Sequence, residues 1–204
     1  NLPTVGTDGE QPSPAATPIR FNRPTLMGRE LELVAEAMDG GWTAAAGPFS
    51  RIAEQLLSDA HDGAAVLLCT SCTGALELAA MTLGIGPGDV VAVPSFTFPS
   101  TASAFARTGA RLRFIDIDPN TLGMDADHLA DQLDHRVKAV VPVHYAGRQA
   151  SIEAACAAAD RVGAQVVEDN AHGMFGAHGG TALGTFGSMS TLSFHETKNF
   201  ICGE

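Results

Sequence analysis

Short apolar runs alternate with amphipathic segments along most of this chain, and no other feature restricts its fold as strongly. The runs have the length of strands and cover residues 64–70, 90–96, 111–117, 138–145, 164–169 and 190–196. The amphipathic segments have the length of helices and cover residues 28–41, 49–62, 74–85, 100–110, 125–134 and 151–163. Short buried strands joined by helices predict an α/β fold of three layers, in which helices cover both faces of a mostly parallel sheet.

The first residues of the chain differ from the rest. Residues 1–18 are rich in Pro, Gly, Thr and Ser, and we expect them to form a disordered tail. Residues 19–204 carry the alternating pattern and are expected to form the folded part. The chain has 204 residues and 45% of them are hydrophobic, which suffices for one substantial core or for one domain plus a fragment of another.

Charge and composition argue against several classes of partner. The chain has 12 Lys and Arg against 23 Asp and Glu, a net charge of −11, so we expect neither nucleic acid nor a membrane as a partner. The sequence lacks a signal pattern and a long apolar run, so a cytoplasmic protein is predicted. His144, His178 and His195 show no metal-ligand pattern, and Cys69 and Cys72 are interpreted as reduced thiols.

The residues that follow each predicted strand are the candidates for a site, because ligands bind at the carboxyl ends of strands in open parallel sheets. Thr73 and Gly74 open the helix that follows residues 64–70. A helix N-terminus offers free N–H groups and a partial positive charge, which suit a phosphate. Ser and Thr also cap helices that bind nothing, so this pair is weak evidence when taken alone.

Four more side chains are expected at the same edge of the sheet. Asp169 ends an apolar strand, where a carboxylate needs a partner such as the cationic ring nitrogen of a ligand, or else reaches solvent. Phe98 either stacks on a flat ligand ring or belongs to the core. His172 either donates to a ligand oxygen or is an ordinary loop histidine, and the amine of Lys198 can attack a carbonyl. Together these parts predict a pyridoxal 5′-phosphate site.

Several stretches also resemble the DegT/DnrJ/EryC1/StrS family of sugar aminotransferases. They are FNRPTLMGRE, SCTGALE, PSFTFPSTASAF, VPVHYAG, VEDNAHG, ALGTFG and SFHETKN. The likeness runs from about residue 19 to the end of the chain. It implies the large domain of a pyridoxal-phosphate transferase of fold type I, similar to aspartate aminotransferase, that works as a homodimer on glutamate and a keto-sugar nucleotide.

The resemblance implies a role for each candidate residue. Lys198 would be the Schiff-base lysine and would carry the proton between substrate and cofactor. Asp169 would pair with the pyridinium nitrogen, Phe98 would stack on the ring, and His172 would lie near the phenolic oxygen. The cofactor phosphate would be held by Thr73, Gly74 and Ser193.

The resemblance further implies that this chain is incomplete. In the family another strand follows, runs antiparallel beside the strand that carries the lysine, and leads into a small C-terminal domain. An internal strand that is missing leaves N–H and C=O groups of its neighbours without partners. We therefore expect the 204 residues to be an incomplete large domain that is inactive alone.

Two alternatives to a sugar aminotransferase stay open. One is a non-catalytic or truncated relative that binds a ligand or dimerises without turnover. The other keeps the cofactor but aminates another sugar position or acts as a dehydratase. Dehydratases of the family carry His in place of the lysine, so Lys198 argues against dehydration.

Overall fold

A computed structural model of the chain describes residues 22–202, so the expected tail at residues 1–18 lies outside the described residues. Within them, the strands of the main sheet are β1 (Val90–Pro94), β2 (Arg111–Ile115), β3 (Val137–Val140), β4 (Gln165–Asp169) and β7 (Met189–Thr191). The strands lie in the order β2-β1-β3-β4-β7, and each neighbouring pair is parallel. The predicted parallel sheet is confirmed. A separate antiparallel pair joins β5 (Ala177–His178) and β6 (Thr181–Ala182).

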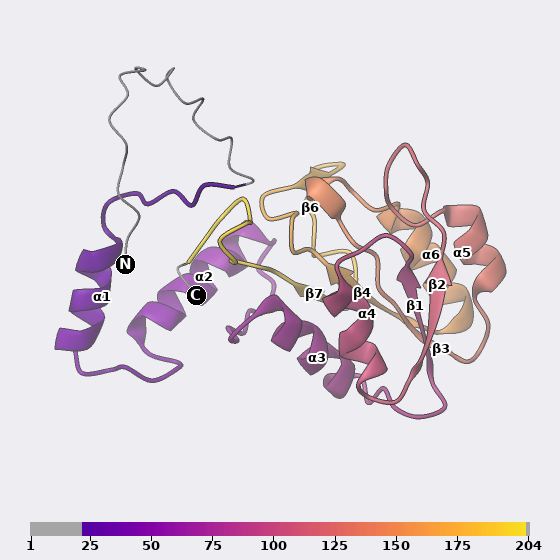
Figure 1. Cartoon of the computed structure of the whole chain (residues 1–204), viewed down its shortest axis with the longest axis horizontal. Coiled ribbons are helices and arrows are strands. Elements are labelled where there is room, and N and C mark those ends of the chain that lie inside the picture. The colour runs from indigo at the N-terminus through magenta and orange to yellow at the C-terminus, as the bar shows by residue number, and fades with distance from the viewer. Residues whose placement is uncertain (1–21, 203–204) are drawn as a thin grey trace, which may run out of the picture.

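Helices cover both faces of the main sheet, as Figure 1 shows. The helices are α1 (Glu30–Asp39), α2 (Pro48–Ala60), α3 (Cys72–Thr82), α4 (Pro99–Ala106), α5 (Ala126–Gln132), the 3₁₀ turn η1 (Tyr145–Gly147) and α6 (Ile152–Val162). α3 and α4 pack on one face and α5 and α6 on the other, which gives the three predicted layers. In the described part of the chain, no helix is long and apolar enough to cross a membrane.

Two apolar cores, one on each face of the sheet, hold the layers together. Val91 and Val93 of β1 belong to the core beneath α3 and α4. Val90 and Ala92 belong to the core beneath α5 and α6. Successive residues of a strand point to opposite faces, so β1 is buried on both sides and its sequence reads as a continuous apolar run.

α1 and α2 lie beside the three-layer body (Figure 1). Leu31, Val34 and Met38 follow one another along α1 at helical spacing, and they are 85%, 56% and 65% exposed. α1 has no buried residue, and α2 buries Leu57. Within residues 22–202 the apolar stripe of α1 therefore has no covering element.

β3 ends at Val140, five residues before the predicted end at residue 145, and two other predicted strands differ more from the structure. The sequence predicts a buried strand over residues 64–70, but these residues form no strand and Leu67 is 70% exposed. The strand predicted over residues 190–196 ends at Thr191. A strand persists only beside backbone groups that can complete its hydrogen bonds. A groove lies between these two segments, so each lacks a partner on the side that faces the other.

Candidate active site

Asp169 is held at the carboxyl edge of the sheet by its neighbours on both sides. It is the last residue of β4 and is 4% exposed. Its N–H donates to the carbonyl oxygen of Pro142 at 2.9 Å, and its own carbonyl accepts from the N–H of His144 at 3.0 Å. On the other side, β7 pairs Thr191 with Asp169. The backbone therefore fixes where the carboxylate can lie.

The carboxylate of Asp169 is buried with hydrogen bonds but without a cation. The hydroxyl of Thr101 donates to Oδ2 at 2.6 Å, and the N–H of Ala171 donates to Oδ1 at 3.2 Å. Among residues 22–202, no Lys, Arg or His nitrogen lies within 4.0 Å of this carboxylate. A buried carboxylate is costly without a positive partner, and a protonated ring nitrogen of a ligand fits that need.

The start of α3 offers donors for an anion. Ser71 caps the helix, and its Oγ accepts from the N–H of Gly74 at 3.1 Å. The N–H groups of Cys72 and Thr73 have no hydrogen-bond partner among the described residues. Thr73 donates through Oγ1 to Oγ of Ser100 at 2.8 Å, which ties the starts of α3 and α4 together. These free N–H groups at a helix N-terminus fit a phosphate.

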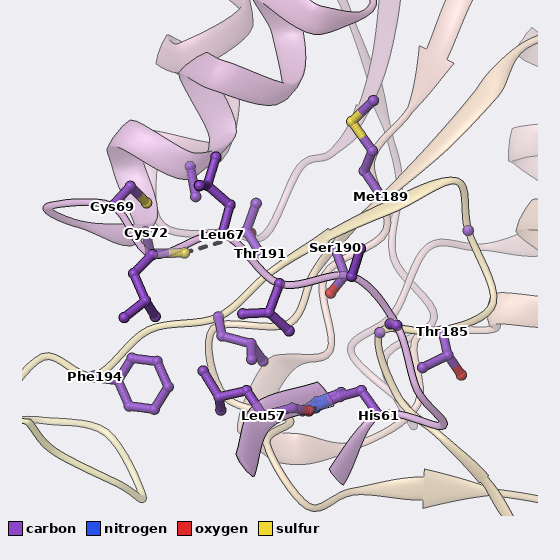
Figure 2. Close-up of a pocket in the computed structure, with 18 of the residues that line it drawn as sticks. Leu57, His61, Leu67, Cys69, Cys72, Thr185, Met189, Ser190, Thr191 and Phe194 are labelled. Atoms are coloured by element: carbon purple, nitrogen blue, oxygen red, sulfur yellow. Dashed lines mark hydrogen bonds between the residues drawn. The ribbon is translucent and has the colours of Figure 1, made fainter. Parts of the chain in front are cut away.

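Cys72 joins the start of α3 to β7. Its Sγ lies 3.5 Å from Oγ1 of Thr191, as Figure 2 shows. Burial, followed by the negative charge of Asp169, raises the pKa of the Cys72 thiol to about 12. The sulfur is therefore a protonated thiol at neutral pH and is no nucleophile.

His172 presents one ring nitrogen as a donor. Its Nδ1 accepts the N–H of Ala146 at 3.1 Å. Its ring lies edge-on to the ring of Tyr145, with 5.0 Å between the two ring centroids. Burial, followed by the positive charge of Lys198, lowers the pKa of His172. The ring is therefore neutral at pH 7 and carries its proton on Nε2, which suits a ligand oxygen that accepts a hydrogen bond.

Ser193 and Lys198 lie on the segment that follows β7. Ser193 is 8% exposed, and its Oγ accepts the N–H of His195 at 3.5 Å. Lys198 is partly buried, and its backbone N–H donates to the carbonyl of His195 at 2.9 Å. Its charge acts on the pKa values of both His172 and Cys72. The amine therefore belongs to the same neighbourhood as the start of α3 and the end of β4.

Phe98 lies at the N-cap of α4 and is 69% exposed. The described residues do not bury it in a core, which was the alternative to a stacking role.

In residues 22–202, no three His, Cys, Asp or Glu side chains are grouped to hold a metal ion. The candidate residues thus offer hydrogen bonds, charge and one amine for chemistry.

Sequence reasoning missed the polar side chains that support the predicted ones. Thr101 binds Asp169, Ser71 caps α3, and Ser100 binds Thr73. All three follow predicted strands, at the positions where polar residues collect in such folds. Their hydroxyls were visible in the sequence, but the partner of each hydroxyl depends on tertiary structure.

A groove of about 670 Å³ borders this site. One wall is formed by residues 62–72, and the other by residues 184–192, which include β7. Figure 2 shows Cys69 and Cys72 near one end of the groove and His61 and Thr185 near the other. The groove therefore runs between the two segments that form less strand than the sequence predicts.

Comparisons with known proteins agree with these observations. The model of the DegT/DnrJ/EryC1/StrS aminotransferase family matches residues 24–204. The spore coat polysaccharide biosynthesis protein SpsC of Bacillus subtilis (strain 168) is 36% identical over 184 residues, which are 90% of this chain and 47% of SpsC.

Solved structures give the same result for the fold. The putative sugar aminotransferase Spr1654 from Streptococcus pneumoniae, in its PLP form, is 28% identical with a TM-score of 0.82, over 90% of this chain and 50% of that one. Spr1654 is also known in a PMP form. The aminotransferase TlmJ from Streptoalloteichus hindustanus is 36% identical with a TM-score of 0.85, over 91% of this chain and 51% of TlmJ. The present chain spans about half the length of these relatives.

Proposed function

Because this chain belongs to the DegT/DnrJ/EryC1/StrS aminotransferase family, we propose that the protein that carries it moves an amino group from glutamate to a keto-sugar nucleotide, with pyridoxal 5′-phosphate as cofactor. One observation carries the proposal. Asp169 is a buried carboxylate with no Lys, Arg or His nitrogen within 4.0 Å in the described part of the chain, at the sheet edge that also bears Lys198 and His172. A protonated ring nitrogen supplies the missing positive charge.

The residues around the ring have separate tasks in this proposal. When bound, pyridoxal 5′-phosphate supplies an electron sink for the carbon that loses its proton. Asp169 stabilises positive charge on the ring nitrogen, and His172 donates from Nε2 to an oxygen of the ring. Phe98, exposed at the start of α4, covers the ring. The partly buried amine of Lys198 attaches the cofactor and moves the proton at the reacting carbon.

The phosphate is held at the start of α3 in this proposal. The free N–H groups of Cys72 and Thr73 point to that end of the helix, where the partial positive charge lies. Gly74 has no side chain to obstruct an anion. The hydroxyl of Ser193 completes the grip, and Thr73 contributes its N–H because its hydroxyl proton is donated to Ser100. This local positive field is needed because the chain as a whole carries a net charge of −11.

We propose dTDP-4-keto-6-deoxyglucose as the acceptor, aminated at C4, which would make the protein a dTDP-4-amino-4,6-dideoxygalactose transaminase. The motifs PSFTFPSTASAF, VPVHYAG, VEDNAHG and SFHETKN support this choice. The aminosugar would serve a surface polysaccharide or a secondary metabolite, and the name of SpsC refers to the former. We further propose a cytoplasmic homodimer.

We also propose that residues 19–204 are an incomplete large domain, which lacks one strand and a small C-terminal domain. The groove beside β7 supports this division, because a strand placed there would pair with backbone on both walls. The chain's coverage of about half of each relative agrees with it. The 204 residues alone are then expected to be inactive.

Lysine chemistry provides the test, because Lys138 and Lys198 are the only lysines in the sequence. The natural protein that contains this chain is incubated with pyridoxal 5′-phosphate and reduced with borohydride, and its intact mass is measured. We expect an adduct that maps to Lys198, is lost in Lys198→Arg and persists in Lys138→Arg, since Lys138 is exposed on β3. If the unmodified protein forms no adduct, the non-catalytic alternative is favoured.

The acceptor is tested separately with the purified keto-sugar nucleotide and glutamate. The expected product is the C4 amine of the 6-deoxy sugar, identified by mass spectrometry and by its proton spectrum. An amine at another carbon would retain the cofactor but replace the proposed substrate. A product that lost water without gaining nitrogen would indicate a dehydratase.

A further inference from the structure

Two threonine hydroxyls form a chain that ends on Asp169. Oγ1 of Thr101 donates to Oδ2 of Asp169 at 2.6 Å, and Oγ1 of Thr97 lies 2.7 Å from Oγ1 of Thr101. A hydroxyl has one proton to donate. Because Thr101 gives its proton to the carboxylate, Thr97 must be the donor to Thr101. The order of donation is therefore Thr97 to Thr101 to Asp169.

The hydrogen bond between Thr101 and Asp169 lies in the core rather than on the surface. Thr101 is fully buried, and Asp169 is 4% exposed. Hydrogen bonds to a charged group are shorter and stronger than those between neutral groups. A buried hydroxyl with an ionised partner is also strengthened by a second donor behind it. Thr101 thus fixes one carboxylate oxygen in position, and Thr97 fixes Thr101.

The same hydroxyls connect two parts of the candidate site. Thr97 and Thr101 lie on either side of Phe98, in the turn that opens α4. Asp169 lies on β4, beyond β1 and β3 in the sheet order. The hydrogen bonds therefore hold the turn that carries the exposed Phe98 ring against the strand end that carries the carboxylate.

We propose that Thr101 is a positioning residue of the cofactor site: oriented by Thr97, it fixes the carboxylate of Asp169 for the ring nitrogen of pyridoxal 5′-phosphate. This inference rests on the proposed function. Neither threonine touches the reacting atoms, and both act through Asp169. Removal of the Thr101 hydroxyl leaves Oδ2 without its donor and frees the carboxylate to rotate.

The test uses the natural protein loaded with pyridoxal 5′-phosphate and compares Thr101→Val, Thr101→Ser and Thr97→Val. The dissociation constant of the cofactor is expected to rise about tenfold in Thr101→Val, as for the loss of a hydrogen bond to a charged group. Thr97→Val should raise it by a smaller factor, and Thr101→Ser should restore the unmodified value. The double variant Thr97→Val/Thr101→Val should resemble Thr101→Val, because Thr97 acts through Thr101.

A second readout separates positioning from a merely structural role. The pH midpoint of the visible absorption band of the bound cofactor should move to higher pH in Thr101→Val. A pyridine nitrogen that is less fully protonated withdraws less electron density from the rest of the cofactor. The group whose deprotonation changes the absorption band then holds its proton more tightly, so the midpoint lies at higher pH. A loss of packing would lower the melting temperature without moving this midpoint.

Thr108→Val is the matched control. Thr108 follows the same helix, and its hydroxyl donates to the carbonyl of Phe105 at 2.7 Å, away from Asp169. We expect it to leave the dissociation constant and the absorption midpoint unchanged. If Thr101→Val does not fold, the half-buried Thr97→Val decides the question by the same two readouts.

The outcomes distinguish this inference from the proposed function. If the unmodified protein binds no cofactor, the proposed function fails and the inference fails with it. If the unmodified protein binds the cofactor but both valine variants keep its dissociation constant and absorption midpoint, the inference alone is overturned.

Discussion

The imidazole of His144 donates from Nε2 to Oε2 of Glu168 across 2.7 Å, and both side chains are fully buried. The direction of donation follows from the other ring nitrogen, since Nδ1 of His144 accepts the N–H of Ala150 at 3.2 Å. Glu168 also accepts backbone N–H groups at 2.7–2.9 Å, from Gly184, Phe186 and Gly187. One carboxylate thus holds the loop that leads into β7 against β4.

Replacement of Glu168 by Gln should destabilise the protein strongly. All four partners of the carboxylate are donors, so the amide group of Gln would place its own N–H against one of them. Each hydrogen bond lost to a buried charged group costs about 1.5–3 kcal/mol. Thermal and urea unfolding of the natural protein would measure this loss.

Glu153→Gln is the control for that variant. Glu153 also lies close to a histidine, with its Oε1 3.5 Å from Nε2 of His178, but its side chain is 76% exposed. Exposed pairs contribute little to stability, so this variant should unfold like the unmodified protein. Equal stability of Glu168→Gln and Glu153→Gln would contradict the anchoring role of Glu168.

The same carboxylate should make stability depend on acid pH. Burial raises the pKa of Glu168, but the hydrogen bonds from His144, Gly187 and Gly184 outweigh it and lower that pKa below its ordinary value of 4.5. A lowered pKa in the folded state gives stability that is present above the unfolded value. We therefore expect the free energy of unfolding to fall as pH drops below 4.5 and on through the lowered pKa.

Unfolding curves at a series of pH values between neutral and acid would check this dependence. Glu168→Gln cannot ionise at this position, so its stability should fall less steeply over the acid range. An acid dependence that is the same in both proteins would assign it to other carboxylates.

The sequence predicts the five strands of the main sheet but not all of their ends. β1 and β3 lie inside the sheet, and both were expected from apolar runs, at residues 90–96 and 138–145. Both strands are apolar along their length because helices cover both faces of the sheet. The run at residues 64–70 has the same apolar character, but it forms no strand and pairs with no strand among the described residues.

The candidate site shows a similar division. Asp169 could be predicted because a carboxylate at the end of a buried run demands a partner. Thr101 could not be predicted, because its partner lies 68 residues away in sequence. The sequence also could not predict which ring nitrogen of His172 carries the proton. That depends on the N–H of Ala146, which η1 brings to Nδ1. Residue types suggest the chemistry, and tertiary contacts decide orientation and protonation.

Cys72 should resist alkylation in the folded protein. With a pKa of about 12 and a half-buried sulfur, its reactive thiolate is scarce at pH 8. Iodoacetamide labelling followed by peptide mass mapping should find Cys72 largely unmodified in the folded protein and modified in urea. Rapid labelling of Cys72 in the folded state would contradict the raised pKa of its thiol and its contact with Thr191.

Asp169→Asn should remove activity while it preserves the fold. The amide oxygen of Asn can still accept the hydroxyl of Thr101, so the bond between β4 and α4 has a replacement, and only the 3.2 Å contact with the N–H of Ala171 is lost. The negative charge is lost, and with it the stabilisation of positive charge on the ring nitrogen. Loss of such a preorganised electrostatic contact lowers kcat by about 10² or more. Steady-state amino transfer by the natural protein, with a melting curve alongside, would measure both effects.

Asp160→Asn is the control for this last variant, because Asp160 is an exposed residue near the end of α6 and its change also removes one negative charge. It should leave amino transfer unchanged, which would show that the position of the charge matters rather than the net charge of the protein. The decisive comparison is with Lys198→Arg. If Lys198→Arg is inactive while Asp169→Asn keeps full activity, the lysine is catalytic but the buried carboxylate has no role opposite the ring nitrogen. The observation that carries the proposed function would then need another explanation, such as a purely structural bond between Thr101 and Asp169.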